Sequence, residues 1–384
     1  MFTEKLSHNV EIIGCKKSKL AVALALFAIP LSAMAANNVE LYGIVDIGAL
    51  YQTKANVTGQ SKTSIETSGM RQSILGFKGE KDLKDQMTAF FDLEAHFDVN
   101  NGMFHGTGDA ADTGSPLFRR QSLLGLKGNW GSVTVGRQYG PALLAHLATE
   151  PRAFKEQFSN LYAWAYNQYA ATANKSPGAR NTNNDVGIFF NNAIQYRNTV
   201  GPVEFGIMTA VGGQAGSTTN NNAMALGIAY KGPVVLSGSY QTIKDEATGN
   251  SNVKHSGLGL AVPYNDLTFK ANYLNAKNSA PTGLNVSNVN GIGTGVDWKW
   301  NASNSFTLAY YDNKDDMNKT DHTRNVVISN DYAMGSNVTL YAQMAIVKAD
   351  KGATIKTSIV AGGTGLTGKE NTNTLLNVGV NYPF

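Results

Sequence analysis

Apolar and polar residues alternate along many runs of about ten positions in this chain. The clearest run spans residues 87–97. Its apolar members Phe91, Leu93, Ala95 and Phe97 alternate with the polar residues Asp92, Glu94 and His96. A period of two places successive side chains on opposite faces of a β-strand. The run therefore predicts a strand with one apolar and one polar face, which fits either a soluble sandwich or a membrane barrel.

A repeated pattern, R-Q-S-[IL]-L-G-[FL]-K-G, occurs at residues 71–79 and again at 120–128. The second copy continues through a turn at 128–131 into a further alternating run at 132–135. Two alternating runs joined by a short glycine-containing turn predict a β-hairpin. Because the pattern repeats within one chain, we expect a sheet built from successive hairpins.

The predicted connections between strands are alternately short and long, and this order separates the two folds. Seven short turns are predicted at 80–85, 129–131, 198–201, 231–233, 263–266, 301–304 and 334–337; eight long polar loops are predicted at 52–68, 100–116, 140–185, 212–221, 245–252, 277–288, 314–322 and 349–370. An outer-membrane barrel has tight turns at one end and long loops at the other, whereas a soluble fold has no reason for this sorting. The sequence therefore predicts an all-β fold, a transmembrane 16-stranded antiparallel up-and-down β-barrel.

The two ends of the predicted sheet are suited to close the barrel. The first strand is expected at 39–51 and the last at 375–384. Tyr382 and Phe384 share one face of the last strand and are expected to lie in an aromatic girdle at the membrane boundary. Pro383 donates no hydrogen bond to a neighbouring strand, which is tolerable next to a chain end.

A secretory signal peptide is predicted at residues 1–35, with cleavage after Ala35 or Ala36, and the barrel domain at 36–384. Three lysines, the last of them Lys19, precede an apolar run at 20–31 that is followed by small residues. The run is shorter than the ~20 residues that a membrane helix needs. The single cysteine, Cys15, would leave with this leader, so neither a disulfide nor thiol chemistry is expected in the product.

Composition excludes several functional classes. The chain has 40 glycines and only 16% charged residues, which indicates an all-β protein with many turns. It contains no basic block of the kind that binds nucleic acid and no phosphate-binding glycine loop. The histidines are scattered without the spacing of a catalytic triad or a metal site. We therefore predict neither an enzyme nor a cofactor, metal ion or nucleic-acid partner.

Four segments carry a resemblance to a known family: VELYGIVDIGALY at 39–51, GFKGEKDL at 76–83, RQSLLGLKGNWGSVTVGRQYG at 120–140 and the terminal NYPF. The chain resembles the general porins of Gram-negative bacteria, most of all the trimeric porins of β-proteobacteria and neisseriae. This resemblance implies a homotrimer in the outer membrane, in contact with outer-membrane lipids and lipopolysaccharide, that passes small hydrophilic solutes and ions. It also implies that the terminal aromatic residues, Tyr382 and Phe384, are the membrane-insertion signal that the barrel-assembly machinery recognises.

The resemblance further implies that the long third loop, at about 139–185, folds inward and constricts the pore. Arginines of the barrel wall would then face carboxylates of this loop. The residues that match the family pattern for the constriction are Arg71, Arg120, Arg137, Glu150 and Glu156. Opposed rows of charge create a transverse field that sorts polar solutes. Asp92, Glu94 and His96 are expected to face the lumen.

Several alternatives remain open at the sequence level. The family usually carries an arginine before an Asn-Ser pair after the third loop, whereas this chain has Phe189 and Phe190 there. Either a constriction charge is missing, or Arg180 or Arg197 supplies it from elsewhere. Aromatic residues of the loop either pack it onto the wall or form a track for flat solutes; they are Phe154, Phe158, Tyr162, Trp164, Tyr166 and Tyr169.

A basic isoelectric point of about 8.8 and the resemblance favour a channel that passes anions more readily than cations. A non-conducting structural or adhesive barrel is disfavoured, because sixteen strands leave an aqueous channel.

Overall fold

The computed structural model describes residues 38–56, 58–104, 116–165, 181–185, 187–350, 353 and 372–384. The predicted signal peptide, Cys15 and the N-terminal part of the predicted barrel domain before residue 38 lie outside the described residues. Arg180, Tyr166 and Tyr169 lie outside them as well.

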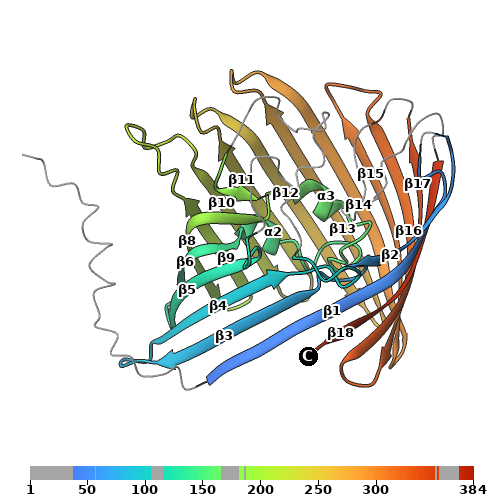
Figure 1. Cartoon of the computed structure of the whole chain (residues 1–384), viewed down its shortest axis with the longest axis horizontal. Helices are drawn as coiled ribbons and strands as arrows, with labels where there is room; N and C mark the ends of the chain where they lie inside the picture. Colours follow the sequence, from blue (N-terminus) through green and yellow to red (C-terminus); the bar gives the residue numbers. More distant parts are fainter. Residues whose placement is uncertain are drawn as a thin grey trace, which may run out of the picture. The chain divides into compact units, whose positions relative to one another are not determined.

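The described residues form one sheet of antiparallel strands and two short helices (Figure 1). The first nine strands are β1 (Asn38–Gln52), β2 (Lys62–Thr67), β3 (Ile74–Asp82), β4 (Thr88–His96), β5 (Gln121–Gly128), β6 (Gly131–Tyr139), β7 (Asn184–Asp185), β8 (Phe189–Val200) and β9 (Val203–Ala210). The others are β10 (Ala223–Lys231), β11 (Val235–Lys244), β12 (Ser251–Tyr264), β13 (Leu267–Ser279), β14 (Asn285–Asn301), β15 (Asn304–Asp315), β16 (His322–Met334), β17 (Val338–Ala349) and β18 (Thr372–Pro383). The helices are α2 (Pro141–Leu144) and α3 (Asn160–Ala165).

The wall of the closed barrel consists of sixteen strands. β2 and β3 are two parts of one strand, because β1 pairs with β2 through 47–52 and with β3 through 38–44. β7 is a two-residue strand attached to the start of β8. Each remaining strand pairs with its sequence neighbours, and β1 pairs with β18 to complete the ring. The predicted sixteen-stranded antiparallel barrel is confirmed.

The seam between the first and last strands is closed by the chain end itself. The Phe384 amide donates to the Gly43 carbonyl at 3.0 Å, and the Gly43 amide donates to the Phe384 carbonyl at 3.0 Å. The buried carboxylate of Asp46 on β1 accepts a hydrogen bond from Asn381 on β18 at 2.9 Å and from Tyr341 on β17 at 2.8 Å. The same carboxylate accepts from the backbone amides of Gly69 at 2.8 Å and Arg71 at 3.0 Å, so Asp46 also holds the bend between β2 and β3.

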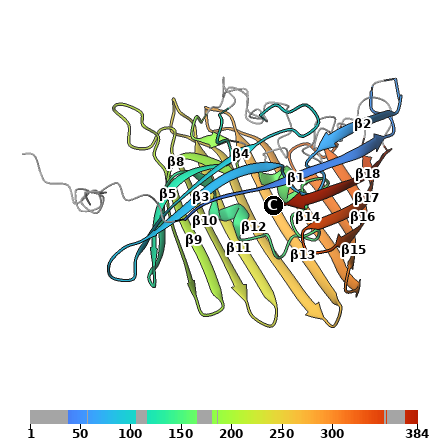
Figure 2. The same ribbon diagram turned by 60° about the horizontal axis from the view of Figure 1, so that its bottom comes forward.

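All seven predicted turns join adjacent strands, and the longer connections lie at the opposite strand ends, as Figure 2 shows. Two turns are displaced from their predicted positions: the turn predicted at 80–85 spans 83–87, and the turn predicted at 198–201 spans 201–202. The loops predicted at 52–68 and 277–288 are shorter in the structure, where they span only 53–61 and 280–284. The polar residues at these strand ends continue the ladder beyond the apolar part of the wall, so their polarity does not mark a loop.

The strands expose their large apolar side chains and cover the alternate positions. On β10, Met224, Leu226 and Ile228 are each about half exposed, whereas Ala223 and Ala225 are buried. We call the face that bears these exposed apolar residues the apolar face and the alternate face the polar face. The apolar face continues around the ring; among its members are Leu41, Leu124, Val135, Ile194, Ile207, Leu236, Leu258, Ile292, Leu308, Val326, Leu340, Ile346, Leu376 and Val378. A soluble protein buries such residues, whereas a membrane barrel presents them to lipid.

Exposed aromatic residues border the apolar face at both ends. Near the short turns these are Tyr264, Trp298, Trp300, Tyr332 and Tyr382; on the side toward the long loops, where the strands continue beyond the apolar residues, they are Tyr51, Tyr240, Tyr273 and Tyr310. Two such girdles mark the two boundaries of a membrane. Among the residues that the structure describes, no helix is long and apolar enough to cross a membrane.

Candidate functional site

The connection between β6 and β8 begins at Gly140 and carries both helices. Pro141 occupies the first turn of α2, where a missing amide hydrogen costs nothing. α2 packs against β9, β10 and β11, and α3 packs against β13 and β14. A side chain at Gly227 on β10 would overlap the Pro141 carbonyl, so glycine there permits the close approach of α2.

His146, in the turn after α2, is fully buried against the polar face of β11. Its Nδ1 lies 2.8 Å from Ser237 Oγ and its Nε2 lies 2.8 Å from Ser239 Oγ. The Trp164 ring approaches His146 edge-on, with the ring centroids 5.9 Å apart. Glycine at 257 on β12 leaves room for this imidazole, because a Cβ there would collide with it. His146 therefore fixes the start of the loop to the wall.

Burial lowers the pKa of His146 from 6.5 to about 4. The undocked loop thus binds a proton more readily than the docked loop, and docking loses stability as the pH falls from about 6.5 toward 4. The difference is worth at most about 3 kcal/mol of docking free energy. We expect amide hydrogen exchange in residues 141–165 to accelerate at pH 4.5 relative to pH 7.5, after correction for intrinsic rates. In a His146→Gln variant this pH dependence should disappear; an identical dependence in both proteins would contradict the assignment.

Glu150 is fully buried and organises the middle of the loop. Its Oε2 accepts hydrogen bonds from the backbone amides of Arg152 at 2.7 Å and Phe154 at 2.9 Å. Its Oε1 accepts from Ser159 Oγ at 2.8 Å and from the Tyr311 hydroxyl of β15 at 2.5 Å. Four donors on one carboxylate define the shape of this part of the loop. Glu150 is therefore a structural centre of the loop and not simply a charge displayed to solutes.

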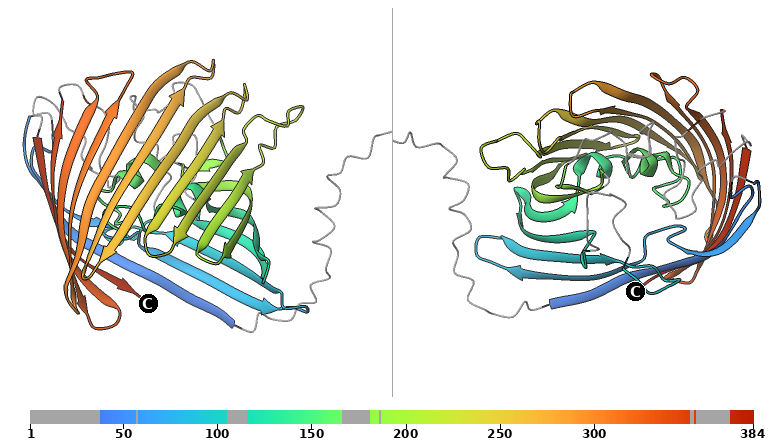
Figure 3. Two further views of the ribbon diagram at one scale, coloured as in Figure 1. Left: turned by 180° about the vertical axis from the view of Figure 1, so that it is seen from behind. Right: turned by 45° about the horizontal axis from the view of Figure 1, so that its top comes forward.

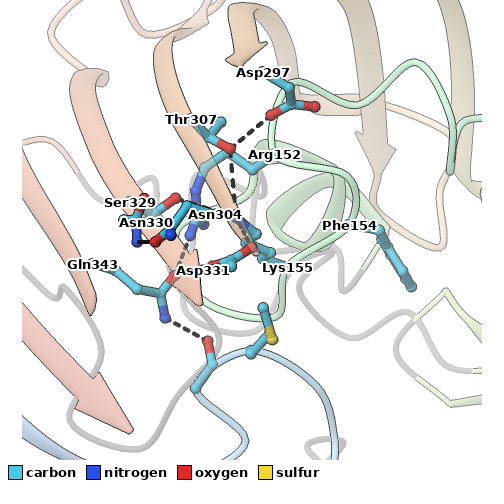
Figure 4. Close-up of polar contacts among 12 residues, drawn as sticks. Arg152, Phe154, Lys155, Asp297, Asn304, Thr307, Ser329, Asn330, Asp331 and Gln343 are labelled. Atoms are coloured by element: carbon cyan, nitrogen blue, oxygen red, sulfur yellow. Dashed lines mark hydrogen bonds and ion pairs between the residues drawn. The ribbon is translucent and has the colours of Figure 1, made fainter. Parts of the chain in front are cut away.

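Arg152 and Lys155 attach the loop to the far side of the ring (Figure 4). Arg152 donates to the side chain of Gln343 on β17, and it is fully buried. The Lys155 amine lies 2.7 Å from Asp331 on β16 and 3.2 Å from Ser329 Oγ. Burial lowers the pKa of Lys155, and the adjacent Asp331 carboxylate opposes this effect.

A second ion pair lies beside this attachment. Lys270 on β13 pairs with Asp297 on β14 at 2.5 Å, and Thr307 on β15 donates to Asp297 at 2.7 Å. Thr307 also lies 3.5 Å from the Lys155 amine and thus stands between Lys155 and Asp297 (Figure 4). The two ion pairs therefore belong to one network. The loop is thus bonded directly to β15, β16 and β17, and it reaches β14 through Thr307.

Glu156 is connected to the wall through a glutamine. Gln72 donates to Glu156 Oε1 at 2.8 Å, and the Glu156 amide donates to the Met70 carbonyl at 2.8 Å. The side-chain carbonyl of Gln72 accepts a hydrogen bond from Arg120. The predicted wall arginine Arg120 and the predicted loop carboxylate Glu156 therefore lie at the two ends of one hydrogen-bonded chain.

Arg120 forms an ion pair with a carboxylate of the wall. Its Nε lies 3.0 Å from Glu94 Oε2, and its guanidinium also donates to the Tyr139 hydroxyl. Glu94 accepts a further hydrogen bond from the Tyr42 hydroxyl at 2.8 Å, and that hydroxyl lies 2.6 Å from Asp92 Oδ1. His96 lies at the end of β4 with its Nε2 3.4 Å from Ser68 Oγ. Asp92, Glu94 and His96 therefore share the polar face of β4, as their spacing predicts.

The surroundings of Arg137 and Arg71 differ from those of Arg120. Arg137 donates to the Arg119 carbonyl and to Asn191 Oδ1 at 2.5 Å, and its guanidinium lies 5.6 Å from the centre of the Phe189 ring. Arg71 is exposed, and its backbone amide is one of the donors to Asp46. The predicted opposition of Arg137 to Glu150 or Glu156 stays a prediction. Arg197, the alternative source of charge, pairs with Glu204 close to the turn at 201–202.

Two aromatic residues of the loop, Phe158 and Trp164, pack onto the wall. Phe158 and Trp164 are almost fully buried, and the Trp164 indole donates to the Asn275 carbonyl of β13 at 2.9 Å. The Trp164 ring also lies 4.9 Å from the His255 ring of β12, measured between centroids. This burial supports a packing role for both residues.

The sequence predictions missed Asp46, Gln72, Arg152, Lys155 and Tyr311. Asp46 is the only acidic residue between 41 and 65, in an otherwise apolar strand, and that isolation was a usable signal. Arg152 and Lys155 form a charge cluster with the two predicted glutamates within seven residues of a chain that has only 16% charged residues. Gln72 lies in the repeated pattern at 71–79, but neither its contacts nor those of Tyr311 could be predicted, because their partners are distant in sequence. Within the described residues, no group of three or more His, Cys, Asp or Glu side chains could hold a metal ion.

A family model described as Gram-negative porin matches residues 21–352. The chain belongs to the Gram-negative porin family. It is 36% identical over 123 residues to outer membrane porin protein 32 of Delftia acidovorans, and 34% identical over 122 residues to major outer membrane protein P.IB of Neisseria meningitidis. These matches cover 32% and 31% of this chain, and only about a third of the length of each relative, 32% and 33%. The resemblance to β-proteobacterial and neisserial porins is thereby confirmed.

Solved structures confirm the fold over nearly the whole chain. The anion-selective porin from Comamonas acidovorans superposes with a TM-score of 0.74 at 20% identity, covering 90% of this chain and 99% of that one. OmpF of Salmonella typhi superposes with a TM-score of 0.61 at 16% identity, covering 91% of this chain and 98% of that one. At such identities the likeness concerns the fold alone. Family membership and fold place the protein in the outer membrane of a Gram-negative bacterium, among proteins that are channels rather than enzymes.

Proposed function

We propose that the protein is a passive diffusion channel for small hydrophilic solutes and ions. The observation that carries this proposal is the closed sixteen-stranded ring with its apolar side chains outward and its polar ones on the other face. Barrel width grows with strand number, and sixteen strands leave room for water inside. Solutes would cross down their gradients without a nucleotide or other cofactor.

We further propose that residues 140–165 fold into the lumen and constrict it. The loop is hydrogen-bonded to polar-face residues of strands on both sides of the ring, from Ser237 on β11 to Asn377 on β18. Figure 3 (right) draws α2 and α3 within the ring of strands. In this proposal Arg71, Arg120 and Arg137 line the constriction, and Glu156 faces them through Gln72. Asp92, Glu94 and His96 belong to the lumen wall next to it.

Three ion pairs of the described residues lie in and beside the proposed constriction. Arg120 pairs with Glu94, Lys155 with Asp331 and Lys270 with Asp297. Paired charges create a local transverse field but little net potential along the pore. The proposed channel is therefore weakly selective, and its preference for anions or cations depends on the arginines that line the constriction.

Single-channel recording in a planar bilayer tests the proposed function. We expect stepwise, ohmic openings from the purified, folded protein. A well-folded barrel that inserts but stays silent would contradict the channel and would favour a structural or adhesive role. Measuring reversal potentials across a salt gradient in the same bilayer gives the selectivity of the channel.

We propose that three copies assemble into a homotrimer. Ala49 is a small residue exposed on the apolar face of β1, which keeps part of this end strand thin enough for close contact between barrels. We expect a species of trimer mass that survives mild detergent and collapses to the monomer only on heating. A monomer band in unheated, mild detergent would contradict this assembly.

We also propose which segments direct the protein to the outer membrane. Residues 1–35 would act as the signal peptide, and the exposed terminal residues Tyr382 and Phe384, whose ring centroids lie 6.4 Å apart, would form the signal for the barrel-assembly machinery. Phe384 also closes the seam through its backbone. A Phe384→Ala variant retains those backbone bonds, so it separates recognition from closure.

A further inference from the structure

Two lysines face each other on the apolar side of the barrel wall, at its long-loop end. Lys254 on β12 and Lys277 on β13 are paired residues of the antiparallel ladder, and both are exposed. Their positions belong to the apolar face, because Leu258 lies four residues along β12 and Tyr273 four residues along β13, and both are exposed. Directly paired residues of a ladder have Cβ atoms about 5 Å apart.

This pair of like charges has no acidic partner among the described residues, since neither lysine forms an ion pair there. A comparable pair, Arg324 on β16 opposite Lys348 on β17, is partly neutralised. Arg324 lies 3.6 Å from an Asp312 oxygen and 3.4 Å from an Asp350 oxygen. Like charges directly opposite each other destabilise a sheet, so the Lys254–Lys277 pair costs stability unless an anion lies between the two amines.

The height of the pair on the wall indicates where that anion comes from. Tyr273 belongs to the aromatic girdle on the long-loop side, and Lys277 lies about 13 Å further along β13, away from the membrane centre. Aromatic girdles lie at the level of the lipid head groups, and long loops of outer-membrane barrels face the outside. Because barrel strands tilt by about 40°, the two lysines lie about 10 Å above the girdle, and their long side chains bring the amines back to the phosphate level of the outer leaflet.

The neighbouring residues on this rung are polar. Thr242 on β11 is paired with Lys254, and Asn288 on β14 is paired with Lys277. Asn288 also shares the acceptor Asp316 with Asn290, at 3.4 and 2.6 Å, which directs that carboxylate to the asparagines. A hydroxyl, an amide and two amines in one row suit a phosphate attached to a sugar, in which charge and hydrogen-bonding groups alternate.

We propose that Lys254 and Lys277 clamp a phosphate of the phosphorylated glycolipid of the outer leaflet. The acyl chains of this lipid would lie along the apolar face below, over Leu258 and Tyr273. The inference rests on the proposed channel only for its orientation, with the long loops outside. It assigns a lipid site to the outer surface of the barrel, separate from the pore.

Binding to lipid A in detergent micelles tests the clamp. The probe is fluorescently labelled, bisphosphorylated lipid A, titrated into lipopolysaccharide-free, refolded protein. Charge-assisted hydrogen bonds to phosphate are individually strong, so a Lys254→Gln/Lys277→Gln variant is expected to bind about tenfold more weakly than the native protein. The matched control is Lys84→Gln/Lys299→Gln, which removes two exposed lysines of the short-turn end and should bind like the native protein.

Further measurements identify the source of the anion and test whether the variant folds. Dephosphorylated lipid A should bind the native protein and the Lys254/Lys277 variant equally weakly, and inorganic phosphate at the same concentration should not displace the labelled lipid. Without lipid A, Lys277→Gln should unfold at the same or a higher temperature than the native protein, because it relieves the repulsion between the two lysines.

Equal lipid A affinity of the two double variants, or displacement of the labelled lipid by inorganic phosphate, would overturn the proposal. Single-channel conductance of the Lys254/Lys277 variant should match the native value, so a silent channel would concern the proposed function and not the clamp.

Discussion

Replacing Asp46 with alanine is expected to lower the free energy of unfolding by about 3–5 kcal/mol, the largest effect we expect from any single substitution in the wall. The carboxylate of Asp46 is fully buried and accepts hydrogen bonds from Tyr341, Asn381 and three consecutive backbone amides. Removing it leaves these donors without their acceptor in a place that water does not reach. Because the donors come from β17, β18 and the bend before β3, the loss weakens the closing seam and the bend together.

Urea titration of the protein refolded into lipid vesicles, followed by heat-modifiable migration on a gel, measures this effect. An Asp46→Asn variant retains one acceptor oxygen and should lose less stability than Asp46→Ala. Asp312→Ala is the control, because Asp312 is partly exposed and its ion pair with Arg324 lies near the surface, where such pairs contribute about 0–1 kcal/mol. Equal losses in Asp46→Ala and Asp312→Ala would show that the seam does not depend on the Asp46 carboxylate.

The barrel could be predicted from the sequence because its determinants are local. Alternation along a strand such as β4 and the short turns between strands depend on residues close in the chain. The sorting of short and long connections then fixes the order of pairing, since each strand pairs with the next. The terminal residue Phe384 was expected at a membrane boundary, and its exposed ring is consistent with that place.

The partners in the candidate site could not be predicted in the same way. Glu150 and Tyr311 are 161 residues apart, and Arg152 and Gln343 are 191 apart, so no spacing in the sequence relates them. The family pattern predicts a region of opposed charge, but it does not distinguish a displayed carboxylate from a buried one. Glu150 matches the pattern of a constriction charge, yet its four hydrogen bonds hold the loop together.

Arg120→Ser is expected to shift the ion selectivity toward cations more than any other single arginine substitution in the barrel. Loss of the guanidinium leaves Glu94, 3.0 Å from it in the native protein, without its ion-pair partner, and releases Gln72 from its contact with Arg120. A unit charge about 8 Å from a permeating ion in water changes the energy of that ion by about 0.5 kcal/mol. The opposite effects on cation and anion combine to change the permeability ratio by about fivefold, reduced to about twofold by salt screening.

Reversal potentials in a tenfold salt gradient measure this ratio for a matched series. Arg137→Ser should shift selectivity in the same direction, and Glu156→Gln in the opposite one. Glu150→Gln should instead alter the conductance and its noise, because it releases the loop from Tyr311 and Ser159. Lys314→Ser is the control: Lys314 lies on β15, paired with Asn290 and His322 on the apolar face, and screening over ~8 Å separates it from the proposed pore. If Arg120→Ser and Arg137→Ser move the reversal potential no further than Lys314→Ser, the charges that sort ions lie elsewhere in the barrel.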